Sequence, residues 1–134
     1  MHNNILKRIF EFLEEKEGHN VPFLWKFEND IPLTEGDLNV KGDLDLFDSK
    51  ITSLPEGLKV SGTLDLSYSK IISLPKGMEV GGTLFLHYSK ITSLPEGLEV
   101  RYNLYIGDSP LIKYSAKELR EMIKPGFIKG RIVR

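Results

Sequence analysis

The chain has 134 residues, enough for one domain with a buried core, and its formal net charge is −1. The absence of cysteine excludes disulfides and thiolate metal sites. The 40% share of hydrophobic residues does not indicate disorder, and the net charge does not indicate a strongly basic nucleic-acid-binding protein. The chain contains no apolar run near 18 residues and no secretory signal pattern at its start, so we expect a cytoplasmic protein that does not bind a membrane.

Residues 1–30 predict an N-terminal helical cap. From Asn4 onward apolar residues recur at helical spacing, and Gly18 is typical of the end of a helix. These apolar residues are Ile5, Leu6, Ile9, Phe10 and Leu13. The bulky residues that follow are Phe23, Leu24, Trp25 and Phe27. We expect this second group to cover the open end of the region that follows, and dimerisation through the helix is the alternative interpretation.

Residues 31–110 repeat at a period of 20 residues. The octet "ITSLPEGL" occurs at Ile51–Leu58 and again at Ile91–Leu98, and "IISLPKGM" lies between them at Ile71–Met78. A fixed period of this length predicts a solenoid, in which each coil buries its apolar edge only against its neighbours. We therefore expect about four stacked coils inside a single domain spanning residues 1–134.

Within each coil, apolar residues alternate with polar ones, which predicts a strand with one buried face. Stacking the coils in parallel would align these positions into inward columns about 4.8 Å apart. The expected columns are Leu38, Leu58, Met78 and Leu98; Val40, Val60, Val80 and Val100; Leu44, Leu64, Leu84 and Leu104; and Leu46, Leu66, Leu86 and Ile106. The octet then forms the return of each coil, where Pro75 restricts the backbone and Gly77 permits a tight bend.

The string "LDLSYSKIISLP" resembles the pattern L-x-L-x-x-N-x-L-x-x-L-P of the leucine-rich-repeat family, and the period is similar to that of its shortest bacterial class. The resemblance covers about Ile31 to Leu111 and implies an α/β solenoid with one parallel β-sheet. The residues of the two flanks predict a helical cap at each end. Serine replaces the asparagine of the family, and its inward hydroxyl can bond neighbouring backbone less fully. These serines are Ser49, Ser69, Ser89 and Ser109. Because the alternation starts early, at Leu58 and Val60, a parallel β-helix is the alternative fold.

Residues 111–134 predict a C-terminal helical cap and tail. The segment "SAKELREMIKPG" begins with a Ser115–Glu118 capping box and ends with a Pro125–Gly126 stop, and "FIKGRIVR" predicts a short terminal strand. After Leu111 there are seven Lys or Arg residues and two Glu residues. Nucleic-acid contact through this basic end is a lesser alternative, disfavoured because the segment has few aromatic residues and no recognised motif.

No pattern of catalytic residues is present. The histidines His2, His19 and His87 are scattered, and the chain has no phosphate-binding loop, nucleophile elbow or metal-ligand spacing. The acidic residues Asp43, Asp45, Asp48 and Asp65 fall on neighbouring coils. They could bind calcium, but a solvated acidic face is the preferred interpretation. We therefore expect a protein that is not an enzyme and holds no cofactor or metal.

The outward columns vary, and they carry the candidate binding residues. One column reads Asp45, Asp65, Phe85 and Tyr105, and the ends of the strands add Phe47, Tyr68, His87 and Tyr88. Exposed aromatic residues beside carboxylates are typical of a protein-binding surface. We expect the aromatic residues to anchor a partner and the two carboxylates of the column to act as rim charges that favour a basic patch. Simple packing of the aromatic side chains across the strands is the alternative.

These features together predict a module that binds another protein, with a monomer favoured over a homo-oligomer. Similar very short repeat proteins occur in bacteria and their phages, so the resemblance implies an effector or inhibitor of a host protein. The alternative is a structural component of an assembly, such as part of a virion, that associates with copies of itself.

Overall fold

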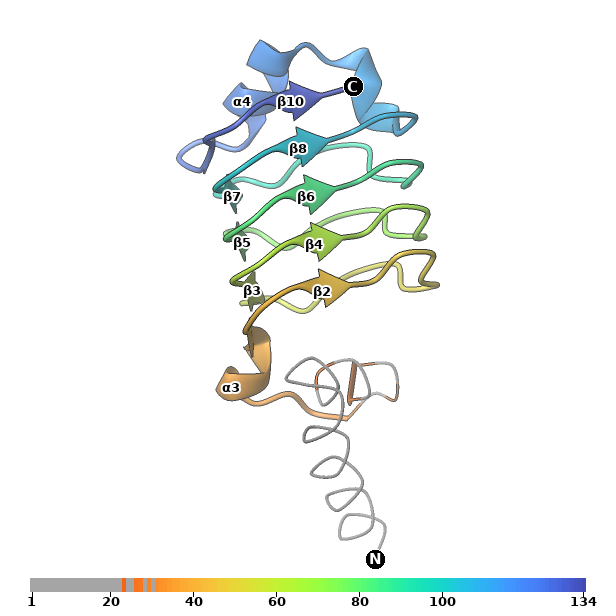
Figure 1. Cartoon of the computed structure of the whole chain (residues 1–134), viewed down its shortest axis with the longest axis vertical. Helices are drawn as coiled ribbons and strands as arrows, with labels where there is room; N and C mark the ends of the chain where they lie inside the picture. The colour runs from red at the N-terminus through yellow and green to blue at the C-terminus, as the bar shows by residue number, and fades with distance from the viewer. Residues whose placement is uncertain (1–22, 24–25, 28, 30) are drawn as a thin grey trace, which may run out of the picture.

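The structure is a computed structural model that describes Phe23, Lys26, Phe27, Asn29 and residues 31–134. The expected helix from Asn4 to Gly18, and the expected covering residues Leu24 and Trp25, lie outside the described residues. The described chain forms a β-solenoid whose coils stack along one axis, with the C-terminal helix at the opposite end from a short helix near residue 35 (Figure 1).

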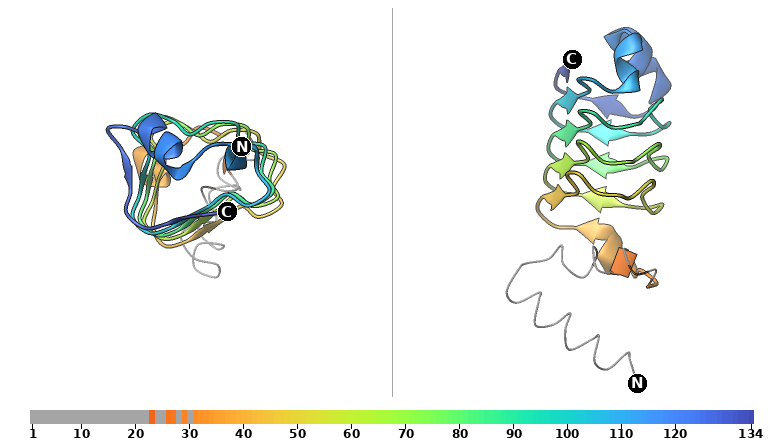
Figure 2. Two further views of the ribbon diagram at one scale, coloured as in Figure 1. Left: turned by 90° about the horizontal axis from the view of Figure 1, so that it is seen from above. Right: turned by 90° about the vertical axis from the view of Figure 1, so that its right-hand side faces the viewer.

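Each coil contributes two short strands, one to each of two parallel sheets. The first sheet has the order β1 (Asn39–Val40), β3 (Lys59–Val60), β5 (Glu79–Val80), β7 (Glu99–Val100) and β9 (Phe127–Ile128). The second sheet has the order β10 (Ile132–Val133), β8 (Leu104–Tyr105), β6 (Leu84–Phe85), β4 (Leu64–Asp65) and β2 (Leu44–Asp45). Seen along the solenoid axis, the coils superimpose closely, and the two sheets form two of the walls (Figure 2).

The prediction of one longer strand and one sheet was wrong. The chain turns a corner between the two strands of each coil. Gly42, Gly62 and Gly82 occupy this corner in the first three coils, and Tyr102 occupies it in the fourth. A Cβ atom at Gly82 would lie 2.8 Å from the backbone carbonyl carbon of Gly62, so the neighbouring coils approach too closely there for a side chain. The alternation of inward and outward residues continues through this corner, so the two strands of a coil have the sequence pattern of a single longer strand.

The inward columns and their register are confirmed. Each strand pairs with the strand 20 residues away, so Val60 lies between Val40 and Val80, and Leu84 lies between Leu64 and Leu104. The predicted inward residues from Val40 to Ile106 are buried and form one continuous core. Leu38 is the exception, because it belongs to a short helix and is half-buried.

Two of the inward serines donate to the backbone of their own coil, as expected, whereas the buried Ser89 hydroxyl has no hydrogen-bond partner among the described residues. The Ser69 hydroxyl donates to the Leu66 carbonyl at 2.6 Å, and the Ser109 hydroxyl donates to the Ile106 carbonyl at 2.7 Å. Gly77 adopts the predicted bend with a φ of 71°, in the left-handed region that favours glycine.

The C-terminal segment contains the predicted helix and terminal strand, together with further elements that were not predicted. It contains a 3₁₀-helix, η1 (Pro110–Lys113), and the helix α4 (Ala116–Met122), whose Ser115–Glu118 capping box is formed. Helix α4 ends at Met122, before the predicted Pro125–Gly126 stop. The tail then adds β9 to the first sheet and β10 to the second, and the Arg120 guanidinium donates to the carbonyls of Ile128 and Gly130 beside these strands.

The short helix α3 (Glu35–Leu38), which the sequence did not predict, lies immediately before β1. Thr34 and Asp37 form its capping box, and Lys26 pairs with Asp37 at 2.8 Å. Phe23 is buried in the core cluster and stacks on Phe27, which confirms these two expected covering residues. Among the described helices, none is both long enough and apolar enough to cross a membrane.

Candidate functional site

Aromatic side chains gather along the second sheet and the turns that follow its strands. The turn stack consists of Phe47, Tyr68 and Tyr88. The Tyr68 and Tyr88 rings lie 4.6 Å apart and are tilted by 18°, and the Phe47 ring lies 5.2 Å from that of Tyr68 at a tilt of 55°. About half of each of these three side chains is exposed, so the stack forms a ridge on the surface.

The two tyrosines of the turn stack occupy an unusual backbone conformation. Their φ angles are 59° for Tyr68 and 54° for Tyr88, in the left-handed region. The equivalent turn residues in the flanking coils, Asp48 and Asp108, share this conformation. Aspartate tolerates it well, whereas a bulky ring there is an outlier that costs about 1 kcal/mol or more. The coil therefore folds with a small acidic residue at this position and does not need an aromatic one.

The sheet stack consists of Phe85, Tyr105 and His87. Phe85 and Tyr105 are paired residues of β6 and β8, and their half-buried rings lie 4.8 Å apart at a tilt of 20°. The His87 ring lies 5.6 Å from the Tyr105 ring and rests against Gly107, where a Cβ atom would come within 2.8 Å of the imidazole Nδ1. Glycine at position 107 therefore makes room for the imidazole.

Asp45 and Asp65, which precede Phe85 in the same outward column, accept hydrogen bonds from nearby backbone amides. The Asp45 carboxylate accepts a hydrogen bond from the Phe47 amide at 3.0 Å, and the Asp65 carboxylate accepts one from the Ser67 amide at 2.9 Å. Both carboxylates therefore stabilise the turn after their strand. In the part of the chain that the structure describes, no three or more His, Cys, Asp or Glu side chains are grouped so as to hold a metal ion.

The electrostatic environment of Tyr88 is set by the last turn of the repeat. A hydrogen bond with the Asp108 carboxylate, together with the negative charge of that group, raises the pKa of the Tyr88 hydroxyl above its usual value. The Tyr88 hydroxyl is neutral at neutral pH, as an ordinary tyrosine is, and it donates to Asp108.

The structure thus brings the predicted aromatic residues together in two stacks instead of one central pair. Phe85, Tyr105 and His87 form the first group, and Phe47, Tyr68 and Tyr88 form the second. Asp45 and Asp65 lie in the same column as Phe85, on the two preceding strands of the second sheet. Among the described residues, the most exposed aromatic side chain is that of Tyr102, which is 64% exposed and was not among the predicted site residues.

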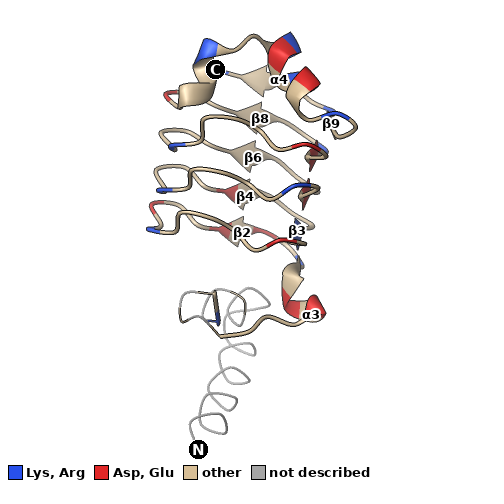
Figure 3. Cartoon of the chain, turned by 180° about the vertical axis from the view of Figure 1, so that it is seen from behind, with Lys and Arg blue, Asp and Glu red and all other residues tan. Residues whose placement is uncertain are grey.

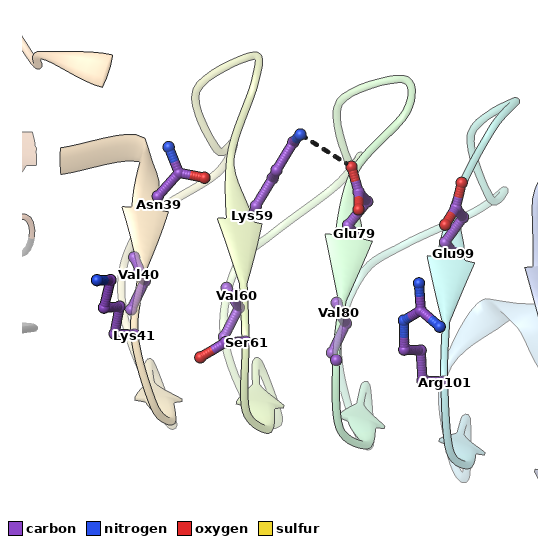
Figure 4. A pocket seen from close by; sticks show the side chains of 11 residues that line it. Asn39, Val40, Lys41, Lys59, Val60, Ser61, Glu79, Val80, Glu99 and Arg101 are labelled. Atoms are coloured by element: carbon purple, nitrogen blue, oxygen red, sulfur yellow. Dashed lines mark ion pairs between the residues drawn. The ribbon is translucent and has the colours of Figure 1, made fainter. Parts of the chain in front are cut away.

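The outer face of the first sheet was not predicted from the sequence as a separate surface. Its outward residues line a shallow groove of about 440 Å³, in which Lys59 pairs with Glu79 at 3.1 Å (Figure 4). The long side chains around this groove belong to Lys41, Lys59, Glu79, Glu99 and Arg101. Polar residues on both sides of Val40, Val60, Val80 and Val100 were the signal for this face, but they were attributed to a single strand.

The fold and the aromatic surface define a β-solenoid with coils of about 20 residues and a ridge of stacked rings along one edge. A comparison with known protein families, curated proteins and solved structures finds no match to this chain.

Replacing Tyr88 with asparagine should change the free energy of unfolding by less than about 1 kcal/mol, because asparagine relieves the left-handed backbone while the ring stacking is lost. Urea denaturation of the parent and the variant measures this difference. Phe85→Asn is the matched control, and we expect it to be more destabilising because Phe85 is half-buried on a regular strand. A loss above about 2 kcal/mol for Tyr88→Asn would show that the turn stack is mainly structural.

Proposed function

We propose that this chain is a module without enzymatic activity that binds another protein through its aromatic surface. This surface consists of Phe47, Tyr68, Phe85, His87, Tyr88 and Tyr105. The observation that carries the proposal is that Tyr68 and Tyr88 are half-exposed and yet held in a left-handed backbone conformation. Conformations of this kind cluster at functional sites, where the local cost is retained for a reason other than folding.

The remaining coil positions support this interpretation. The core is uniform from coil to coil, with valine or leucine in nearly every inward column. The outward positions change sharply, from Asp45 and Asp65 to Phe85 and Tyr105 in one column. Exposed aromatic side chains that the fold does not require are the residue type that most often dominates the energy of a protein interface.

The resemblance to leucine-rich repeats belongs to the same proposal. The period and the string "LDLSYSKIISLP" support it, while the two sheets of the solenoid, each built from one strand per coil, differ from the single sheet that the resemblance implied. If the chain is related to the short repeat proteins of bacteria and their phages, an effector or inhibitor of a host protein is the narrower proposal, and a monomer is its expected form. The site of action is proposed to be the cytoplasm.

Capture from a lysate of the native cell tests the proposal. The purified chain should retain a specific partner, and the double variant Phe85→Asp, Tyr105→Asp should lose it. The matched control is Ile72→Asp, Ile112→Asp, which places the same charges at two exposed isoleucines outside the aromatic surface. Equal loss of the partner in both variants, or retention in both, would contradict the proposal.

Light scattering after size-exclusion chromatography is the companion measurement, because a building block of an assembly would associate with copies of itself. If the parent chain is an oligomer and the Phe85→Asp, Tyr105→Asp variant is a monomer, the aromatic surface serves self-association instead.

A further inference from the structure

A row of lysines lies beside the turn stack. Lys50, Lys70 and Lys90 follow β2, β4 and β6 at a spacing of 20 residues, and all three are exposed. Figure 3 shows positively charged residues on these turns, one above another along one edge of the solenoid. We call Lys50, Lys70 and Lys90 the lysine row.

The lysine row differs from the other charged columns of the solenoid. The column at Glu56, Lys76 and Glu96 alternates in sign, and Lys59 forms an ion pair with Glu79 in the next coil. The lysine row contains only cations, and among the described residues none of the three forms an ion pair. Because parallel coils lie about 4.8 Å apart, like charges in adjacent coils repel one another. An anionic partner would relieve this repulsion.

The lysine row and the turn stack form two adjacent columns. Lys70 follows Tyr68 by two residues and Lys90 follows Tyr88 by two, so in each pair the Cα atoms are at most about 7.6 Å apart. Among the described residues, the cations that lie over aromatic rings are on Arg101, Lys113 and Lys129. The ammonium groups of the lysine row are therefore not used by the neighbouring rings.

The way the rings stack determines which chemistry they can offer. Tyr68 and Tyr88 cover each other's faces at 4.6 Å, so the covered faces are closed to a partner and the ring edges remain. The Tyr88 hydroxyl is already bonded to Asp108. Ring edges carry partial positive charge and favour oxygen atoms of carboxylates and carbonyls. Single-stranded nucleic acid binds mainly by stacking its bases on free ring faces, and these two rings cover one face of each other. The combined surface is therefore better matched to a peptide with acidic side chains than to nucleic acid.

We propose that the lysine row and the turn stack together bind an extended, acidic segment of the partner protein. This inference rests on the proposed function and specifies the chemistry of the partner. Side chains on one face of an extended segment repeat every 6.6–7 Å or so, which lets flexible lysines reach acidic residues at every second position. Asp48 lies in the first turn of the row and Asp108 in the turn beyond Lys90, and both would repel carboxylates there, so the segment is centred on Lys70 and Lys90.

The charges of the neighbouring sheet set the path of this segment. Asp45 and Asp65 lie on the strands of the second sheet, so an acidic segment follows the lysine side of the turn and avoids the sheet face. Basic groups elsewhere on the same partner would then face Asp45 and Asp65. The partner therefore contributes an acidic segment along the lysine row and basic groups opposite Asp45 and Asp65.

The test uses a fluorescein-labelled decapeptide of alternating Glu and Thr, whose binding to the full chain is followed by fluorescence anisotropy at about 150 mM salt, where charges farther apart than about 8 Å are largely screened. The triple variant Lys50→Glu, Lys70→Glu, Lys90→Glu should bind at least about tenfold more weakly than the parent. The matched control Lys41→Glu, Lys76→Glu, Lys117→Glu makes the same change of charge at exposed lysines elsewhere and should stay within about threefold of the parent. Tyr88→Asn should also weaken binding.

Three results of the peptide experiment would overturn the inference. The first is no binding of the peptide at millimolar concentration, and the second is equal loss in both triple variants. The third is tighter binding of an oligothymidylate than of the peptide through the same lysines, which would point to nucleic acid. If the native partner is lost in Phe85→Asp, Tyr105→Asp but retained by the lysine-row variant, the proposed function stands and the acidic segment does not.

Discussion

Replacing Leu84 with alanine is expected to lower the free energy of unfolding by about 2–5 kcal/mol. Leu84 is fully buried, and its column places it directly between Leu64 and Leu104, so the lost side chain leaves a cavity that neither neighbouring coil can fill. Urea denaturation monitored by circular dichroism measures the loss. Thr92→Ala, at an exposed position of a return, is the control and should change the stability little. A loss under about 0.5 kcal/mol for Leu84→Ala would mean that the register of the inward columns is wrong.

Removing residues 115–134 is expected to cause aggregation. This deletion takes away α4 together with β9 and β10, which pair with β7 and β8 and form the C-terminal end of each sheet. The last repeat coil would then expose unpaired strand edges and the buried side chains of Leu98 and Leu104. Size-exclusion chromatography of the full and shortened chains makes the comparison. A shortened chain that elutes as a monomer with an unchanged circular dichroism spectrum would overturn the assignment of this segment as a cap.

The register of the solenoid could be predicted because the 20-residue period determines which residues of neighbouring coils are aligned. Any residue of the repeat lies next to the residue 20 positions away, so the identity of the columns at Val60 and Leu64 followed without any knowledge of the fold. The Ser115–Glu118 capping box was equally accessible, since it depends on local chemistry over four residues.

The division into two sheets could not be predicted from the alternation. Inward and outward residues alternate with the same period on both sides of the corner at Gly62 and Gly82, so a bent coil and a straight strand have the same pattern. The glycines were the available signal, because a close approach of backbones excludes a side chain there. The same ambiguity hid the outer face of the first sheet and its groove beside Lys59 and Glu79.

The candidate surface was predicted in part. The columns placed Phe85 beside Tyr105 and Tyr68 beside Tyr88, as the structure shows. The left-handed backbone of the two turn tyrosines was not predicted, although Asp48 and Asp108 at the equivalent positions are residues that tolerate this conformation. The face-to-face contact of the rings depends on side-chain orientation, which the sequence period does not specify.

The dissociation rate of the captured partner is the most direct test of the central claim that the aromatic surface binds a protein. Surface plasmon resonance should show that Phe85→Ala speeds dissociation by about tenfold or more, since aromatic anchors commonly lose 2 kcal/mol or more when truncated. Ile72→Ala, a truncation at an exposed site outside the surface, should leave the rate unchanged. If Phe85→Ala dissociates like the parent while Lys117→Glu and Lys124→Glu abolish binding, the interface lies on the basic C-terminal cap and the aromatic stacks are only packing.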